Sequence, residues 1–127
     1  HERSRRQRQM CIRDRSREAG MNSLCVVLTT TNSVASANTI ASALLERKLA
    51  ACVQILPGIT SLYRWEGKIA SDQEIQLIIK STSPVIDEAY EVVKRLHPYD
   101  VPEWVVLNSV VASEDYLRWA QQVTNQM

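Results

Sequence analysis

Residues 44–68, LLERKLAACVQILPGITSLYRWEGK, carry the main structural signal of the chain. They contain, in order, the end of an amphipathic helix, a long apolar strand with one interruption, and the turn of a hairpin. Ala50 to Leu56 form a near-continuous apolar run, which is typical of a buried strand. Pro57-Gly58 predicts a bend or bulge that does not end the strand, because apolar residues resume directly after it. Glu66-Gly67 predicts the turn.

A strand of this length, bent near its middle, is expected to extend beyond the sheet of so small a chain. Its far end then needs another surface to cover it, because an uncovered apolar strand promotes pairing with other chains. We expect that surface to come from another subunit.

Composition indicates a single folded domain. The chain has 127 residues, 45% of them hydrophobic, which is enough to bury a core, and without Phe that core must be mainly aliphatic. No apolar run approaches the roughly 20 residues that span a bilayer, and the N-terminal region lacks the apolar stretch of a secretory signal. We therefore predict a cytoplasmic protein with no membrane partner. Three cysteines without CxxC spacing, Cys11, Cys25 and Cys52, predict free thiols.

The net charge of +1 conceals a basic N-terminal region. Residues 1–20 carry seven Arg and three acidic residues, whereas the remainder is net acidic. Few apolar residues and no periodicity predict a disordered tail, and without an aromatic residue to stack on bases we do not expect nucleic acid as a partner. The favoured interpretation of the tail is translated upstream or cloning sequence before a natural start at Met21. The domain is then expected to span residues 21–127.

The first part of the domain predicts a strand followed by a helix. Leu24 to Leu28 is apolar on both faces, as in a central strand. Thr29 to Ser33 is interpreted as a polar turn that supplies a helix N-cap, with Asn32 or Ser33 favoured. The helix that follows is expected to bury residues at spacings of three and four, namely Ala37, Ile40, Ala41, Leu44 and Leu45.

The second half of the chain predicts a further strand and helix. Lys68 to Lys80 alternates in part, as in a strand that pairs with the first arm of the hairpin. Ser83-Pro84 predicts an N-cap with proline at the first helical position, and Pro98 ends that helix. The expected buried faces are Ile75, Leu77 and Ile79 in the strand and Val85, Ala89, Val92 and Leu96 in the helix.

A last strand and a terminal helix complete the pattern. Trp104 to Val110 is apolar enough for a strand inside the sheet rather than at its edge. Ser113 predicts the N-cap of a short helix that carries Tyr116 and Trp119. The order is βαββαβ plus a C-terminal helix, which predicts an α+β fold, a ferredoxin-like sandwich with a long central hairpin.

The segments ERKLAACVQILPGITSLYRWEGKI, EIQLIIKS, LHPYDVPE and YLRW resemble the CutA family of divalent-cation tolerance proteins. With the strand and helix before them, they cover essentially all of residues 24–123. The resemblance implies a ferredoxin-like subunit in a homotrimer, similar in architecture to the PII nitrogen-regulatory proteins, and an association with copper. It implies no enzyme activity, and the chain shows neither a phosphate-binding loop nor an activated nucleophile.

His97 is the candidate metal ligand. Of the copper ligands suggested for relatives, only this histidine carries over, because Thr29 and Leu96 stand where relatives can have a cysteine and a second histidine. Copper favours several nitrogen, oxygen or sulfur ligands, and Tyr99, Asp100 and Glu103 could add oxygens if the turn after His97 folds back toward the helix end. The alternative is that His97 caps carbonyls at the end of its helix.

A small polar pocket between subunits is the second candidate site. Its expected members are Trp65, Glu66, Glu74, Lys80, Tyr99, Glu103, Tyr116 and Trp119. The aromatic residues have an alternative role in interface packing, and the charged ones in a solvated or paired polar face. The first functional hypothesis is therefore a trimeric protein of divalent metal ion tolerance that binds copper. The alternative is a PII-like sensor of a small anionic ligand, or a trimeric scaffold for a partner protein, with no metal role.

Overall fold

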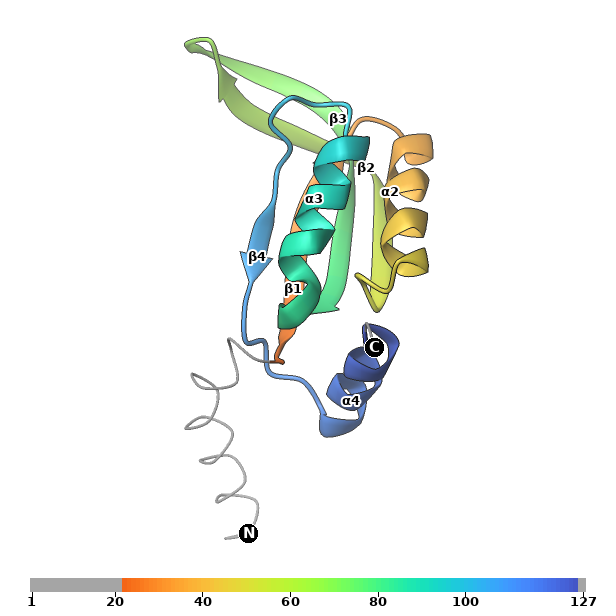
Figure 1. The fold of residues 1–127 in the computed structure, drawn as a ribbon. Coiled ribbons are helices and arrows are strands. Elements are labelled where there is room, and N and C mark those ends of the chain that lie inside the picture. Colours follow the sequence, from red (N-terminus) through yellow and green to blue (C-terminus); the bar gives the residue numbers. More distant parts are fainter. Residues whose placement is uncertain (1–21, 126–127) are drawn as a thin grey trace, which may run out of the picture.

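The computed structural model describes residues 22–125 (Figure 1). The predicted tail, residues 1–20, lies outside them. The described chain forms β1 (Leu24–Thr31), α2 (Val34–Glu46), β2 (Cys52–Trp65), β3 (Lys68–Thr82), the 3₁₀ helix η1 (Ser83–Val85), α3 (Ile86–Leu96), β4 (Val105–Leu107) and α4 (Glu114–Val123). No helix in this range is long and apolar enough to cross a membrane.

The four strands form one antiparallel sheet in the order β2-β3-β1-β4. Helices α2 and α3 lie side by side over one face of the sheet, and α4 lies at the end of the sheet away from the hairpin (Figure 1). Each of the two βαβ units encloses a strand of the other unit, because β3 lies between β1 and β2, and β1 lies between β3 and β4. The predicted α+β ferredoxin-like sandwich, with its long hairpin and C-terminal helix, is confirmed.

The core lies between the sheet and the two helices. Val27 and Leu77 of the central strands pack with Ile40 and Leu44 of α2, and all four side chains are at most 1% exposed. The helical spacing of three and four places the buried residues of α2 on one stripe. The prediction that Leu45 joins this stripe is wrong, since it is 44% exposed. It follows Leu44 directly and so lies about 100° around the helix from it.

Strand β1 is longer than predicted. Thr29 to Thr31 continue the strand instead of forming a turn, because β-branched threonines suit a strand and their backbones pair with β3. The buried hydroxyl of Thr31 lies 2.7 Å from the Ser36 hydroxyl, which satisfies both groups. Ser33 is the N-cap of α2, as predicted, and its Oγ accepts a hydrogen bond from the Ser36 backbone N–H at 3.0 Å.

The hairpin of β2 and β3 follows the prediction. The pairing register shifts between Leu56 and Ile59, where Pro57-Gly58 forms the bulge. Glu66 and Gly67 form the turn with φ of 51° and 76°, a conformation that glycine adopts at little cost because it has no Cβ. Beyond the bulge, the hairpin bends away from the helices and projects to the upper left in Figure 1.

Two strands lie at sheet edges, although one apolar run predicted a buried strand and the other predicted a strand inside the sheet. Strand β2 forms one edge, and β4 forms the other with three residues instead of the predicted Trp104 to Val110. Val105 and Leu107 of β4 are 46% and 48% exposed. An apolar run predicts contact with an apolar surface, but it does not say that the surface belongs to the same chain.

Helix α3 differs from the prediction in its N-cap and in one residue of its buried face. It is preceded by the 3₁₀ turn, and the Ser83 hydroxyl accepts a hydrogen bond from the Ser23 backbone N–H at 3.0 Å instead of capping the helix. At the other end, Leu96 is 40% exposed, and Val93 is fully buried in its place. The helix ends at Leu96, two residues before Pro98, as expected.

Candidate functional site

Carboxylates and phenols meet near the base of the projecting hairpin. The Tyr99 hydroxyl donates a hydrogen bond to Glu74 Oε2 at 2.9 Å, and the Tyr63 hydroxyl donates to the Asp72 carboxylate. Glu103 lies close enough for the charge of Glu74 to act on it. We call these five residues the carboxylate–tyrosine cluster. It joins β2, β3 and the segment between α3 and β4, which are far apart in the sequence.

The cluster concentrates negative charge. Burial, followed by the hydrogen bond to Glu74, raises the pKa of Tyr99 to about 12. The hydrogen bond to Asp72 is the main cause of a raised pKa at Tyr63, and burial together with the Glu74 charge raises the pKa of the Glu103 carboxyl. Both phenols therefore remain protonated donors at neutral pH. The ion pairs of the described range lie on helix surfaces and include none of these carboxylates, so a bound cation would relieve their repulsion.

His97 lies at the C-terminal end of α3 and is 9% exposed. Its Nε2 lies 2.7 Å from the Thr30 carbonyl oxygen of β1, and its Nδ1 accepts a hydrogen bond from the Tyr99 backbone N–H at 3.0 Å. The side chain thus joins α3 to the central strand instead of capping a carbonyl of its own helix. Its assignment as a metal ligand stays a prediction, and ligation would displace one of these two hydrogen bonds.

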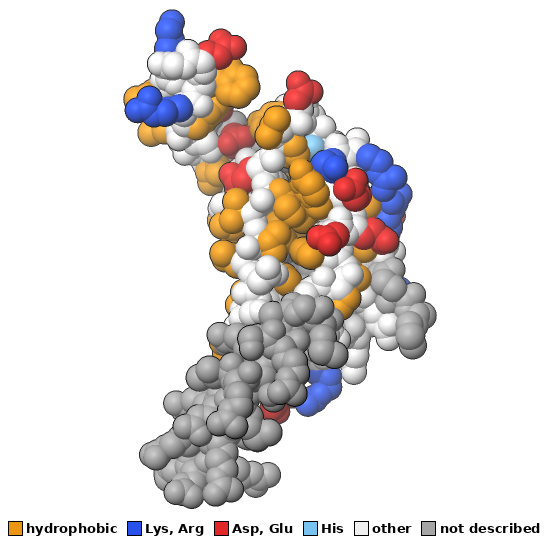
Figure 2. Space-filling model, turned by 60° about the vertical axis from the view of Figure 1, so that its left-hand side comes forward, with side chains coloured by type: hydrophobic (Ala, Val, Ile, Leu, Met, Phe, Trp, Pro, Cys, Tyr) orange, Lys and Arg blue, Asp and Glu red, His pale blue; other side chains and the backbone are white. Residues whose placement is uncertain are grey.

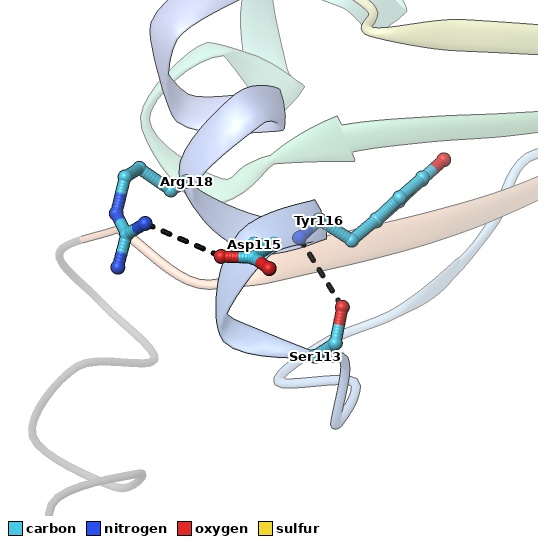
Figure 3. A network of polar contacts seen from close by, with 4 residues as sticks. All are labelled: Ser113, Asp115, Tyr116 and Arg118. Carbon is cyan, nitrogen blue, oxygen red and sulfur yellow. Dashed lines mark hydrogen bonds and ion pairs between the residues drawn. The ribbon is translucent and has the colours of Figure 1, made fainter.

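A second group of predicted site residues lies at the other end of the sheet. Lys80 Nζ is 5.8 Å from the centre of the Tyr116 ring, and the rings of Tyr116 and Trp119 are 5.4 Å apart. Ser113 caps α4, with its Oγ accepting from the Tyr116 backbone N–H at 3.2 Å. Figure 3 shows the Tyr116 side chain extending along the sheet, away from the Arg118–Asp115 ion pair.

The remaining predicted pocket members, Trp65 and Glu66, are at the tip of the hairpin. Trp65 is 64% exposed. In a single subunit, the eight predicted residues therefore occupy three places: Glu74, Tyr99 and Glu103 in the carboxylate–tyrosine cluster, Lys80, Tyr116 and Trp119 beside α4, and Trp65 and Glu66 at the tip.

Sequence reasoning missed two members of the cluster, Tyr63 and Asp72. A signal for Asp72 was present, because Asp72 and Glu74 are two residues apart in a strand and so point to the same face. The position of Tyr63 is determined by the hairpin register, in which it pairs with Ala70. That register depends on the bulge between Leu56 and Ile59, which could not be placed exactly from the sequence. A groove of about 440 Å³ between η1 and α4, lined by residues that include Asn22, Pro84 and Gln121, contains none of the predicted site residues.

The face of the sheet opposite α2 and α3 meets a helix of the described range only at one end, where Lys80 of β3 lies beside Tyr116 of α4. We call this the open sheet face. Side chains alternate along a strand, so Val26 and Leu28 point to it while Val27 between them points to the helices. The residues that pair with Val26 and Leu28 on the neighbouring strands point to the open sheet face as well. Its apolar members include Val26, Leu28, Ile78, Val105 and Leu107. In the space-filling view, hydrophobic side chains form a band on the β4 side of the molecule below the hairpin, with acidic side chains between the band and the hairpin (Figure 2).

Comparisons with known proteins agree on one family. The family model described as CutA1 divalent ion tolerance protein matches residues 25–123. A divalent-cation tolerance protein CutA of Thermus thermophilus is 48% identical over 99 residues, which are 78% of this chain and 96% of that protein. A protein CutA of Mus musculus is 43% identical over 88 residues, which are 69% of this chain and 50% of that protein.

Solved structures show the same fold. The Cut A1 protein of Thermus thermophilus superposes with a TM-score of 0.78 at 47% identity and covers 80% of this chain and 99% of its own. CutA1 from Oryza sativa superposes with a TM-score of 0.78 at 39% identity and covers 82% of this chain and 95% of its own. Both similarities span the described domain.

Proposed function

The chain belongs to the CutA1 divalent ion tolerance protein family, and from this premise we propose that it acts as a homotrimer that binds a divalent cation, with copper as the first candidate. The proposed binding region is the carboxylate–tyrosine cluster and its surroundings, where His97 is the nearby imidazole. The observation that supports this most directly is that the carboxylates of the cluster, which include the buried and hydrogen-bonded Glu74, form no ion pair with a basic side chain of residues 22–125.

The chemistry of the cluster suits a cation. Carboxylate and phenol oxygens bind divalent metals, and among first-row divalent ions copper binds a given site most tightly. Within residues 22–125, no group of three or more His, Cys, Asp and Glu side chains is placed to hold a metal ion. The proposed site therefore takes further ligands from a neighbouring subunit.

The hairpin supports the proposed self-association. In its register, Trp65 and Tyr63 lie on one face of the hairpin, and Leu62 and Ile69 lie on the other. These side chains are between 40% and 75% exposed. Apolar groups exposed on both faces of a projecting element favour insertion between other surfaces, and the open sheet face of another subunit is one such surface.

Light scattering on the full chain tests the assembly. We expect about three times the chain mass of 14.4 kDa, because a three-fold ring closes while each subunit inserts one hairpin and receives another. A stable monomer at micromolar concentration would contradict the proposed homotrimer.

Calorimetric titration with copper and manganese tests the cation site. The double substitution Glu74→Gln and Glu103→Gln should weaken binding, since it removes two charges and keeps the side-chain shapes. Glu91→Gln is the matched control, because Glu91 is a carboxylate on the surface of α3 that pairs with Lys94 at 3.2 Å. Equal binding by the double variant and the control would exclude the cluster as the site.

A second function has its own support. Lys80 beside Tyr116 and Trp119 combines a cation with two aromatic rings, which suits a small anionic ligand of the kind a PII-like sensor binds. Titration with nucleotides alongside copper separates this function from the first. Nucleotide binding that is lost in Lys80→Met, without any response to copper, would favour the sensor.

A further inference from the structure

The partners of His97 define which ring nitrogen carries the proton. A backbone N–H can only donate, so the nitrogen that faces Tyr99 N–H, Nδ1, must be the acceptor. A carbonyl oxygen can only accept, so the nitrogen that faces Thr30, Nε2, must carry the hydrogen. The buried imidazole is thus a neutral ring with both nitrogens in use.

These two hydrogen bonds connect the central strand to the cluster. From the Thr30 carbonyl the connection runs through the His97 ring to the Tyr99 backbone. The rings of His97 and Tyr99 also pack with centroids 4.8 Å apart and a tilt of 59°. From there, the Tyr99 hydroxyl reaches Glu74 of β3 at 2.9 Å. The position of the phenol therefore depends on the position of the imidazole.

The segment from His97 to Glu103 is attached to β1 at its other end as well. The Thr29 hydroxyl donates a hydrogen bond to the Glu103 carbonyl oxygen at 2.5 Å. Residues 97 and 103 are thus attached to two consecutive residues of β1, which is paired on both sides within the sheet. The segment between them carries Tyr99 and Glu103, two members of the carboxylate–tyrosine cluster.

We propose that His97 is a positioning residue for the cation site rather than a metal ligand. Its imidazole acts as a spacer with one hydrogen bond at each end, and it holds Tyr99 beside Glu74. Together with the hydrogen bond of the Thr29 hydroxyl, it also holds Glu103 near Glu74. A metal ion on either nitrogen would leave the Thr30 carbonyl or the Tyr99 N–H without its buried partner, which is unfavourable. This inference rests on the proposed cation-binding function of the cluster.

Substitutions by amides separate a spacer from a ligand. A glutamine at position 97 can place an N–H near the Thr30 carbonyl, and an asparagine can place an oxygen near the Tyr99 N–H, whereas alanine does neither. We expect His97→Ala to weaken copper binding by about tenfold or more, as for partners that orient metal ligands. With His97→Gln or His97→Asn, most of the copper affinity of the original chain should be retained. Equal loss in all three variants would overturn the proposal, because an amide is a poor substitute for a copper-binding imidazole.

Nitrogen resonances of the histidines give a test that does not depend on whether a chain substituted at His97 folds. With ¹⁵N-labelled histidine, His97 should show a protonated Nε2 and an unprotonated Nδ1, and a comparison with His1→Ala assigns the two histidines. Both signals should keep this pattern when zinc, which is diamagnetic, is added to saturation. Loss of the Nε2 proton or a coordination shift at either nitrogen would overturn the proposal.

A third measurement works without any metal. If His97 holds Tyr99 against Glu74, His97→Ala should lower the pKa of Tyr99 from about 12 towards its ordinary value. The alkaline absorbance difference between each chain and its Tyr99→Phe counterpart reports this phenol alone. A lowered pKa with no copper binding by the original chain would refute the proposed function and retain the positioning role, whereas an unchanged pKa would refute the positioning role.

Discussion

The two faces of the sheet differ in what covers them. On the helix-covered face, Val27 and Leu77 are fully buried by helices of the same chain. On the open sheet face, Val105 and Leu107 are nearly half exposed, and the projecting hairpin exposes Leu62 at 71%. Both regions are apolar in sequence, but only one of them finds a partner within residues 22–125.

This difference separates what one chain can stabilise from what it leaves for another. The helix-covered face contributes to folding at any protein concentration, because its contacts are all intramolecular. The hairpin and the open sheet face contribute fully only when another surface removes them from water. Substitutions in the two regions should therefore respond differently to protein concentration.

Leu44→Ala should have the largest effect. It removes a fully buried side chain from the helix-covered core and should lower the free energy of unfolding by about 2–5 kcal/mol. Leu45→Ala, one residue away and 44% exposed, is the control and should change it by less than about 0.5 kcal/mol. Denaturant titration measures both variants. Equal losses would show that Leu45 is covered in the assembly and that the contrast between the regions is weaker than proposed.

Trp65→Glu should act mainly on assembly. It places a charge at the hairpin tip, where the indole is 64% exposed in one subunit, and should weaken association by about 2 kcal/mol or more if the indole is an interface anchor. Light scattering over a dilution series should show dissociation at concentrations where the original chain is intact. Leu45→Glu introduces the same carboxylate at an exposed apolar position of α2 and should leave the assembly unchanged. A Trp65→Glu chain that stays assembled at every dilution would contradict a hairpin interface.

Gly67→Ala tests the hairpin turn without altering any side-chain contact. The added Cβ would meet no atom within 4 Å, so the only cost is the positive φ of 76°. That conformation costs an L-residue about 1–2 kcal/mol. We expect a loss of stability in this range, measured by thermal unfolding, and a smaller one for the neighbouring Lys68→Ala. No loss at Gly67 would mean that the turn changes its conformation in solution.

Glu103→Gln should have the smallest effect, and the size of that effect depends on pH. Partial burial and the charge of Glu74 raise the pKa of the Glu103 carboxyl, so the folded chain holds this proton to higher pH than the unfolded chain. Stability should therefore fall as pH rises from the ordinary carboxyl range through the raised pKa. The amide removes this loss and should stabilise the chain above that range, by no more than about 0.5 kcal/mol at an exposed residue. Thermal unfolding at acidic and neutral pH checks it, and a stabilisation confined to acidic pH would contradict the assignment.

Much of the fold was predictable because local signals agreed with each other. Ser33 and Ser113 cap helices where the sequence placed caps, and Pro57-Gly58 and Glu66-Gly67 form the bulge and the turn. Each of these depends on a few neighbouring residues and on backbone stereochemistry. The threonines at 29–31 were misread because polar character suggested a turn, while their β-branched shape and buried hydroxyl partners favour a strand.

The candidate site was less predictable, because its geometry joins distant segments. Glu74, Tyr99 and Glu103 were named from the sequence, but nothing local indicates that a phenol from the α3–β4 segment meets a carboxylate of β3. The two hydrogen bonds of His97 were equally hidden, since one of its partners, Thr30, is 67 residues away in the chain. Residue type suggests that a group can bind, whereas its environment shows whether it already has partners.

By itself, the amino-acid sequence determined the order of the helices and strands, the bent hairpin, the ferredoxin-like class and the family. These properties follow from periodicity, caps and turns, which act over short distances along the chain. The tertiary structure alone decided which apolar strands became edges, which sheet face stayed open and which groups surround Glu74 and His97. The physical reason is that burial and hydrogen bonding between distant segments depend on how the completed layers pack, and no local pattern contains that information.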